Sequence, residues 1–158
     1  MENIPNDIQI LQSLNDILRK FSSINIDKLI HNHEKKDDLF LVDLIYVHNW
    51  IKHKTAKRIG KWLKSFISGN VALFLRDEYG VFENLYDPSD TKLYIDFFKT
   101  HPYDVRKEHS VYHFPIFSED RLFGVCIVED KGDLDEIKLE YIKVALNTAS
   151  ILLKDIYR

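Results

Sequence analysis

The stretch Phe114-Pro-Ile-Phe-Ser-Glu-Asp-Arg-Leu-Phe-Gly-Val-Cys-Ile-Val128 decides the fold of this chain. Two apolar runs, rich in aromatic and β-branched residues, flank a polar tetrapeptide, and this arrangement predicts a β-hairpin. We expect the hairpin to run from His109 to Glu129. A helix capped by Asp133 should follow it to about Tyr157. Its expected apolar stripe consists of Ile137, Tyr141, Val144, Thr148 and Ile151.

A second pair of strands lies earlier in the chain. Val71 to Arg76 is rich in strand formers, Asp77-Glu-Tyr-Gly80 is typical of a turn, and Val81 to Tyr86 predicts the returning strand. Between the two hairpins, Thr91 to Thr100 carries apolar residues at helical spacing, which indicates a short helix capped by Ser89 or Asp90. The following His101-Pro102 should end it, because a residue before proline is pushed out of the α region.

Helices precede the sheet. The first runs from about Asn6 to Ser22, and its apolar residues recur at heptad spacing. We expect this stripe to serve as a dimer interface; it consists of Ile10, Leu14, Ile17 and Phe21. A long helix should begin at Asp37 or Asp38 and reach Phe66, with one apolar face that includes His48. A kink between Lys54 and Ala56 is the alternative, so the pattern leaves open whether residues 39–67 form one helix or two.

Composition describes an ordinary globular chain. The 158 residues fit one domain, with N-terminal helices over 1–68 and a sheet with its C-terminal helix over 69–158. The net charge of −3 gives no overall reason to expect binding to nucleic acid or to an anionic membrane. The single cysteine, Cys126, excludes an internal disulfide and fits a cytoplasmic protein. No run reaches the roughly 18 apolar residues of a membrane span. The expected fold is α+β, an antiparallel sheet of four to six strands with helices packed on one face.

The second half resembles a GAF domain. The likeness rests on Asn70-Val-Ala-Leu-Phe-Leu-Arg-Asp-Glu-Tyr-Gly80 as first strand and turn, and on the hairpin stretch quoted above. It covers about Lys57 to Arg158, and PAS-like and roadblock-like domains share much of the pattern. The resemblance implies a regulatory sensor, often dimeric, sometimes binding a small molecule, with a last helix that continues into an output domain or a dimer. The stretch from Asp87 to Glu108 is short for this family, which implies a small pocket.

Few residues suggest chemistry. A nucleophile elbow and a phosphate-binding glycine loop are both missing from the sequence, so it predicts a protein that is not an enzyme and indicates no cofactor. The pair His31 and His33 has the wrong spacing for one helical face, and a solvated loop is favoured over a metal site. An aromatic cluster with one histidine is the candidate ligand-binding set; it consists of Tyr86, Tyr94, Phe98, Tyr103 and His113.

Three hypotheses about function remain. The leading one is a homodimeric regulatory module that relays a signal through its terminal helices to an output domain or partner protein. The second is a small-molecule sensor whose small pocket is lined by the aromatic cluster. The third is a nucleic-acid-binding module that uses a basic helix face with His53 and Trp62, although a solvated face is favoured over it. That face consists of Lys52, Lys54, Lys57, Arg58, Lys61 and Lys64.

Overall fold

The computed structural model describes residues 5–22, 40–77, 79–86, 93–119, 121–132 and 134–154, with the side chains of 40–47 left out. Within these described residues, four helices and five strands follow one another in the order α1 (Asp7–Ser22), α3 (Phe40–Lys64), β1 (Val71–Arg76), β2 (Phe82–Asn84), α4 (Ile95–Thr100), β3 (Arg106–Glu108), β4 (Val111–Ser118), β5 (Arg121–Glu129) and α5 (Glu136–Lys154). The α+β fold expected from the sequence is therefore confirmed.

The five strands form one antiparallel sheet in the order β2-β1-β5-β4-β3. The predicted hairpin is present as β4 and β5, which pair from Val111↔Glu129 to Ser118↔Arg121 with a register shift near Ile116. The short edge strand β3 was not expected from the sequence. It pairs with β4 through a turn in which His109 has a φ of 55°. His109 therefore stands in that turn and does not share a strand face with His113.

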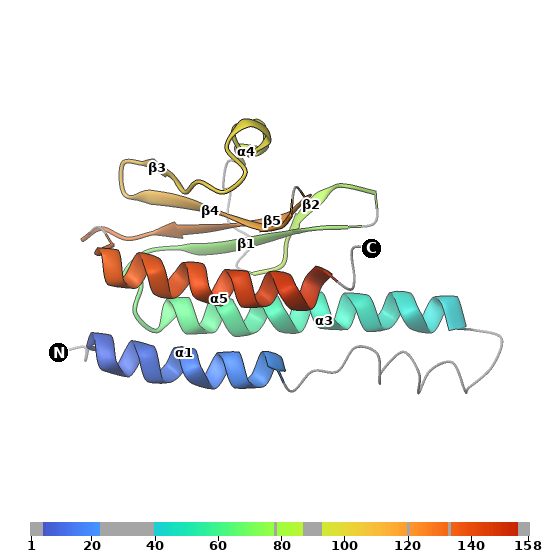
Figure 1. Ribbon diagram of the computed structural model, residues 1–158, viewed down its shortest axis with the longest axis horizontal. Helices are drawn as coiled ribbons and strands as arrows, with labels where there is room; N and C mark the ends of the chain where they lie inside the picture. Colours follow the sequence, from blue (N-terminus) through green and yellow to red (C-terminus); the bar gives the residue numbers. More distant parts are fainter. Residues whose placement is uncertain are drawn as a thin grey trace.

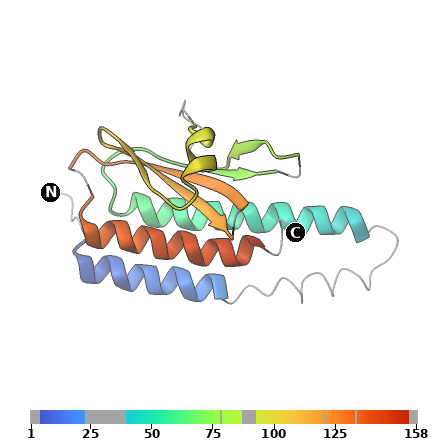
Figure 2. The ribbon, with the colours of Figure 1, turned by 45° about the horizontal axis from the view of Figure 1, so that its top comes forward.

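The elements stack in layers (Figures 1 and 2). Helices α3 and α5 lie side by side on one face of the sheet, and α1 packs against both of them on the side away from the sheet. We call the covered face of the sheet the inner face and the opposite one the outer face. Helix α4 lies on the outer face. The sequence predicted helices on one face only, and the structure places this short helix on the other. One hydrophobic core joins α1, α3, α5 and the inner face.

Helix α1 begins with reciprocal capping. The Asn6 side chain accepts a hydrogen bond from the Gln9 N–H at 2.9 Å, and the Gln9 side chain accepts one from the Asn6 N–H at 3.0 Å. The predicted dimer stripe is buried inside one chain, with exposed fractions between 1% and 7% for Ile10, Leu14, Ile17 and Phe21. Its heptad spacing therefore arises from packing against α3 and α5. These four side chains are not presented to a second copy.

Helix α3 is a single helix of 25 residues, which answers the question that the sequence left open. Its expected start at Asp37 or Asp38 lies outside the described residues. Ile51, Thr55 and Ile59 are buried as the apolar face predicts. The helix tolerates Gly60 because the ring of Tyr86 lies against it: a Cβ at this position would stand 2.5 Å from that ring. The glycine is thus a contact point between α3 and the segment after β2.

Helix α5 differs most from its prediction. It begins at Glu136, and the Asp135 side chain caps it by accepting the Lys138 N–H at 2.8 Å; Asp133 lies outside the described residues. Three members of the predicted apolar stripe face away from the core, since Ile137, Val144 and Ile151 are 47%, 42% and 71% exposed, whereas Tyr141 packs against it. The residues buried instead include Ile142, Ala145, Leu146, Ala149 and Leu153. Apolar residues occupy two faces of this helix, so periodicity alone could not choose between them.

Two other elements are shorter than predicted. The returning strand β2 covers Phe82–Asn84 instead of 81–86. Helix α4 starts at Ile95 instead of 91, and no side chain caps its first turn. The expected caps Ser89 and Asp90 lie outside the described residues. The turn before β2 is as expected: the Asp77 carboxylate accepts the N–H groups of Tyr79 and Val81, and Gly80 has a φ of 83°.

Candidate ligand site on the outer face of the sheet

The outer face carries a small second core of its own. Ala72, Val125 and Ile127 project from the strands and are buried under Phe98 of α4. Partly buried apolar side chains surround this group, namely Phe74, Leu93, Phe97, Val111 and Leu122. These strand residues come from β1, β4 and β5. Side chains alternate along a strand, so the same three strands also supply the main core from their inner face. The six-residue helix α4 therefore stays in place by aromatic packing on the sheet.

His113 is the polar residue at the centre of this face. Its side chain is 3% exposed, and its Nδ1 atom is buried without a hydrogen-bond partner among the described residues. Its pKa is lowered from the ordinary 6.5 to about 4; burial is the largest cause, the nearby Arg106 also lowers the pKa, and Glu108 raises it. The imidazole is thus neutral at pH 7. A buried nitrogen in such a site normally bonds to something, and a water or a ligand atom would satisfy it.

Strand β3 places a charged pair next to this histidine. Arg106 is the register partner of His113, and its guanidinium lies 3.6 Å from the centre of the Tyr94 ring. It also donates to the Glu108 carboxylate at 2.8 Å. Hydrogen bonds from Arg106 and then from Tyr94 lower the pKa of Glu108. The Tyr94 ring meets the His113 ring edge-on at 5.1 Å, so the four side chains form one connected cluster.

A hollow of about 410 Å³ opens next to the outer core, and none of its lining residues belongs to this cluster. Phe98, Lys99, Pro102, Phe117 and Leu122 line it, and Phe98 also belongs to the outer core. Its size lies within the roughly 300–1,000 Å³ of ordinary small-molecule sites. The lining is apolar except for Lys99, which forms an exposed ion pair with Asp96 at 3.1 Å. A molecule with an apolar body and one anionic or polar group fits this lining.

The predicted ligand residues do not all come together. Tyr94 and His113 are in contact, and Phe98 lies on the same outer face in the outer core. Tyr86 instead packs against Gly60 of α3 and the main core. Tyr103 is 55% exposed, donates its hydroxyl to the Glu119 carbonyl at 3.2 Å, and lines a separate cavity of about 70 Å³ near α5. That cavity has room for little more than water.

Two residues of the cluster were missed by sequence reasoning. Arg106 and Glu108 stand two apart on a strand, so their side chains share one face, and that alternation was the available signal. That signal is weak, because β3 has only three residues and stands in a short segment between α4 and β4. Pairing with β4 is what turns this segment into a strand.

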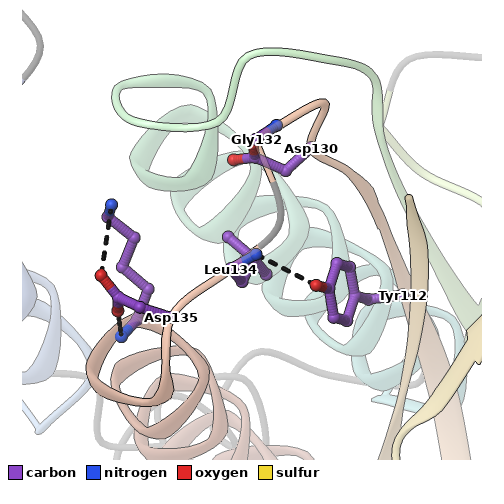
Figure 3. A network of polar contacts seen from close by, with 6 residues as sticks. Tyr112, Asp130, Gly132, Leu134 and Asp135 are labelled. Carbon is purple, nitrogen blue, oxygen red and sulfur yellow. Dashed lines mark hydrogen bonds and ion pairs between the residues drawn. The ribbon is translucent and has the colours of Figure 1, made fainter. Parts of the chain in front are cut away.

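Strand β4 also connects the outer face to α5. Tyr112, the residue before His113, points to the inner face, and its hydroxyl accepts the Leu134 N–H at 3.0 Å (Figure 3). This bond is buried and lies just before α5 begins. On either side, the Gly132 N–H donates to Asp130 at 3.0 Å and Asp135 caps the helix. One strand therefore holds the candidate ligand site on one face and the start of α5 on the other.

The remaining polar candidates play structural parts. Cys126 is fully buried, which raises its pKa to about 12. Trp62 is 4% exposed and donates its indole N–H to the Ser13 hydroxyl at 2.9 Å, so it is not placed to stack on a nucleic-acid base. On the predicted basic face, Lys52 is buried, whereas Lys57 and Lys61 are exposed. The described residues hold no group of three or more metal-binding side chains.

Comparisons with protein-family models, curated proteins and solved structures find no match to this chain. Among the described helices, not one combines the length and apolar character that crossing a membrane requires.

Proposed function

We propose that this chain is a regulatory domain of GAF-like type that binds a small molecule on the outer face of its sheet. The observation that carries the proposal is the hollow of ligand size lined by Phe98, Phe117 and Leu122 next to the outer core. On the same face of the sheet, the buried Nδ1 of His113 has no partner among the described residues. The apolar lining would hold the body of the ligand by the hydrophobic effect. A single buried thiol fits a reducing compartment such as the cytoplasm.

The lining also suggests the chemical class of the ligand. Phe98, Phe117 and Leu122 favour an aromatic or branched apolar body, and Lys99 favours a carboxylate or phosphate at the open end. The surface pair of Lys99 with Asp96 is worth little, so exchanging that partner for a ligand anion costs little. Neutral His113 can donate or accept a hydrogen bond, depending on its tautomer.

Strand β4 would carry the response to the helices. A ligand that bonds to His113 shifts the strand by a fraction of an ångström, and the hydroxyl of Tyr112 transfers that shift to Leu134 at the start of α5. Packed interfaces of this kind respond as units because they are dense. The output is then a change in how α5 presents itself to a partner.

Thermal denaturation against a panel of small carboxylates, phosphates and nucleotides tests the ligand claim. A ligand at about 100 times its Kd should stabilise the fold by about 2.7 kcal/mol. The variant Leu122→Trp fills the hollow and should lose this stabilisation, whereas the matched variant Val81→Trp, on an exposed turn, should keep it. A hit that binds Leu122→Trp as well as the natural chain would contradict the proposed site.

Amide NMR tests the relay with the same ligand. On binding, the Leu134 amide should shift in the natural chain and shift much less in Tyr112→Phe, because the phenylalanine lacks the acceptor oxygen. Equal shifts in both proteins would show that the signal does not pass through this hydrogen bond.

A further inference from the structure

The charges of this chain are unevenly distributed, and the basic ones are concentrated on helix α3 and the strand after it. From Leu44 to Arg76 the sequence contains seven basic residues and no acidic one. The rest of the chain holds all 25 acidic residues and 15 of the 22 basic ones, so its net charge is −10. Such an asymmetry within a small chain is typical of a surface that contacts a polyanion. The low net charge of the whole chain conceals it.

The structure gathers part of this positive charge into one stripe on the solvent side of α3. We call the set Trp50, Lys54, Lys57, Lys61 and Lys64 the α3 stripe. With about 3.6 residues per turn, these five positions lie within about 80° of one another around the helix, and they span about 21 Å along it. Lys54 is half-buried and the other four are exposed. Lys52 and Trp62, which the sequence pattern grouped with these lysines, are buried and do not belong to the stripe.

The lysines of the α3 stripe have no acidic partner within the described part of the chain. The ion pairs there lie on β3, on α4, on α5 and between α5 and the β4–β5 turn. Lys64 donates one hydrogen bond to the Gly69 carbonyl at 2.9 Å, which uses one of its three donors and leaves its charge in place. The Lys54 ammonium lies 5.7 Å from the centre of the Trp50 ring. Four positive charges therefore stand in line beside an exposed aromatic ring.

We propose that the α3 stripe binds single-stranded nucleic acid, with its lysines on phosphates and the Trp50 ring stacked on a base. The flexible stem of a lysine lets each ammonium adjust to a phosphate. Cations that follow the backbone, together with an aromatic ring for the bases, are the general means of binding a single strand without reading its sequence. The stripe lies on α3, which covers the inner face of the sheet, so this site is separate from the ligand hollow on the outer face.

The combination of a line of lysines with an exposed ring selects a single strand over other polyanions. An anionic membrane is a wide plane, and it would meet the acidic remainder of the chain as well as the stripe. A single strand is narrow and can follow the stripe alone. An acidic peptide would satisfy the lysines but would leave the Trp50 ring without a role. In a duplex the bases are stacked on one another, so that ring could receive none of them.

Fluorescence anisotropy of a labelled oligothymidylate of about 12 nucleotides, titrated with the whole chain from about 0.1 to about 300 μM, tests the binding. Non-specific contacts of this kind have a Kd of roughly 1–100 μM at physiological salt. Four phosphate contacts should give a slope of log K against log salt of about −2.8, so the Kd should rise about 50-fold between about 50 and about 200 mM salt. A chain that does not bind, or a Kd that barely changes with salt, overturns the proposal.

Paired substitutions test whether the stripe is the site. Lys57→Gln combined with Lys61→Gln should weaken binding at least about tenfold at about 50 mM salt and halve the slope to about −1.4. Lys143→Gln combined with Lys154→Gln changes the net charge equally on α5, away from the stripe, and should bind like the natural chain. Circular dichroism checks that both variants fold. Equal weakening by the two pairs would show that only the overall charge matters, which overturns the site.

The two tryptophans distinguish a stacked base from other anions. Binding should quench the fluorescence of Trp50, whereas Trp62 is 4% exposed and should not respond, so Trp50→Phe should bind without quenching. Trp50→Ala should raise the Kd at least about fivefold. A duplex of the same length, a polyglutamate peptide and phosphatidylserine vesicles should each bind at least about tenfold more weakly and without quenching. Binding of the strand to the natural chain without quenching, or equal binding of any of these rivals, overturns the assignment to a single strand.

Discussion

Acid should destabilise this fold through His113. The imidazole is 3% exposed, and its pKa in the folded chain is about 4, against the ordinary 6.5 expected when the chain unfolds. The unfolded chain therefore takes up a proton as the pH falls below about 6.5, while the folded chain stays neutral until about pH 4. The stability linked to this residue is complete above about pH 6.5 and is lost as the pH falls towards 4. The loss is on the order of 2 kcal/mol by pH 5 and about 3 kcal/mol below pH 4.

Urea unfolding of the natural chain and of His113→Phe, at about pH 7.5 and about pH 5, measures this loss. Phenylalanine keeps a planar ring between the residues that face His113, which are Tyr94, Arg106 and Glu108, but it cannot take up a proton. His48, whose pKa burial also lowers, titrates in both proteins and cancels in the comparison. The natural chain should lose on the order of 2 kcal/mol more than the variant over this interval. Equal losses in the two proteins would refute the reasoning.

Three further outcomes follow from single contacts. Gly60→Ala should lower the free energy of unfolding by about 1–3 kcal/mol despite the better helix propensity of alanine, because its Cβ meets the Tyr86 ring. Adding Tyr86→Ala should recover part of that loss, and strictly additive losses in urea unfolding would contradict this contact. Tyr112→Phe should lower the free energy of unfolding by about 1–3 kcal/mol, because it leaves the buried Leu134 N–H without its acceptor. It should also speed hydrogen exchange at the Leu134 amide, and unchanged exchange would show that the Tyr112 hydroxyl does not protect this amide. Cys126 should resist a thiol reagent at about pH 8 until urea unfolds the chain, since burial raises its pKa to about 12; rapid labelling of the folded chain would contradict this.

Local patterns in the sequence were sufficient where one physical signal dominated. Strand β1 was predicted at its observed bounds, and the β4–β5 hairpin was predicted within two residues, because apolar runs bounded by polar turns have few other solutions. The start of α1 followed from Asn6, whose side chain makes the expected cap. These features depend on neighbours in the chain, so the sequence determined them.

Only some residues of the candidate site could be predicted from the sequence. Tyr94, Phe98 and His113 are aromatic or titratable, which the sequence shows, and the fold places all three on the outer face, with Tyr94 and His113 in contact. Arg106 and Glu108 were missed because their strand exists only through pairing with β4. Tyr86 was grouped with the others by proximity in sequence, whereas Gly60 of α3 holds it on the opposite side of the sheet.

Local sequence patterns were enough to predict an α+β domain with an antiparallel sheet, the place of its main hairpin, and the residues of α1 that are apolar enough to bury. The buried face of α5 follows only from the packing of the folded chain, because that helix has two apolar faces and the sheet, α1 and α3 can cover one of them. The same packing buries the apolar stripe of α1 and leaves Ile137, Val144 and Ile151 of α5 exposed. Amphipathic spacing indicates that a helix has an apolar face to bury, but the positions of the other helices and strands determine which element packs against that face.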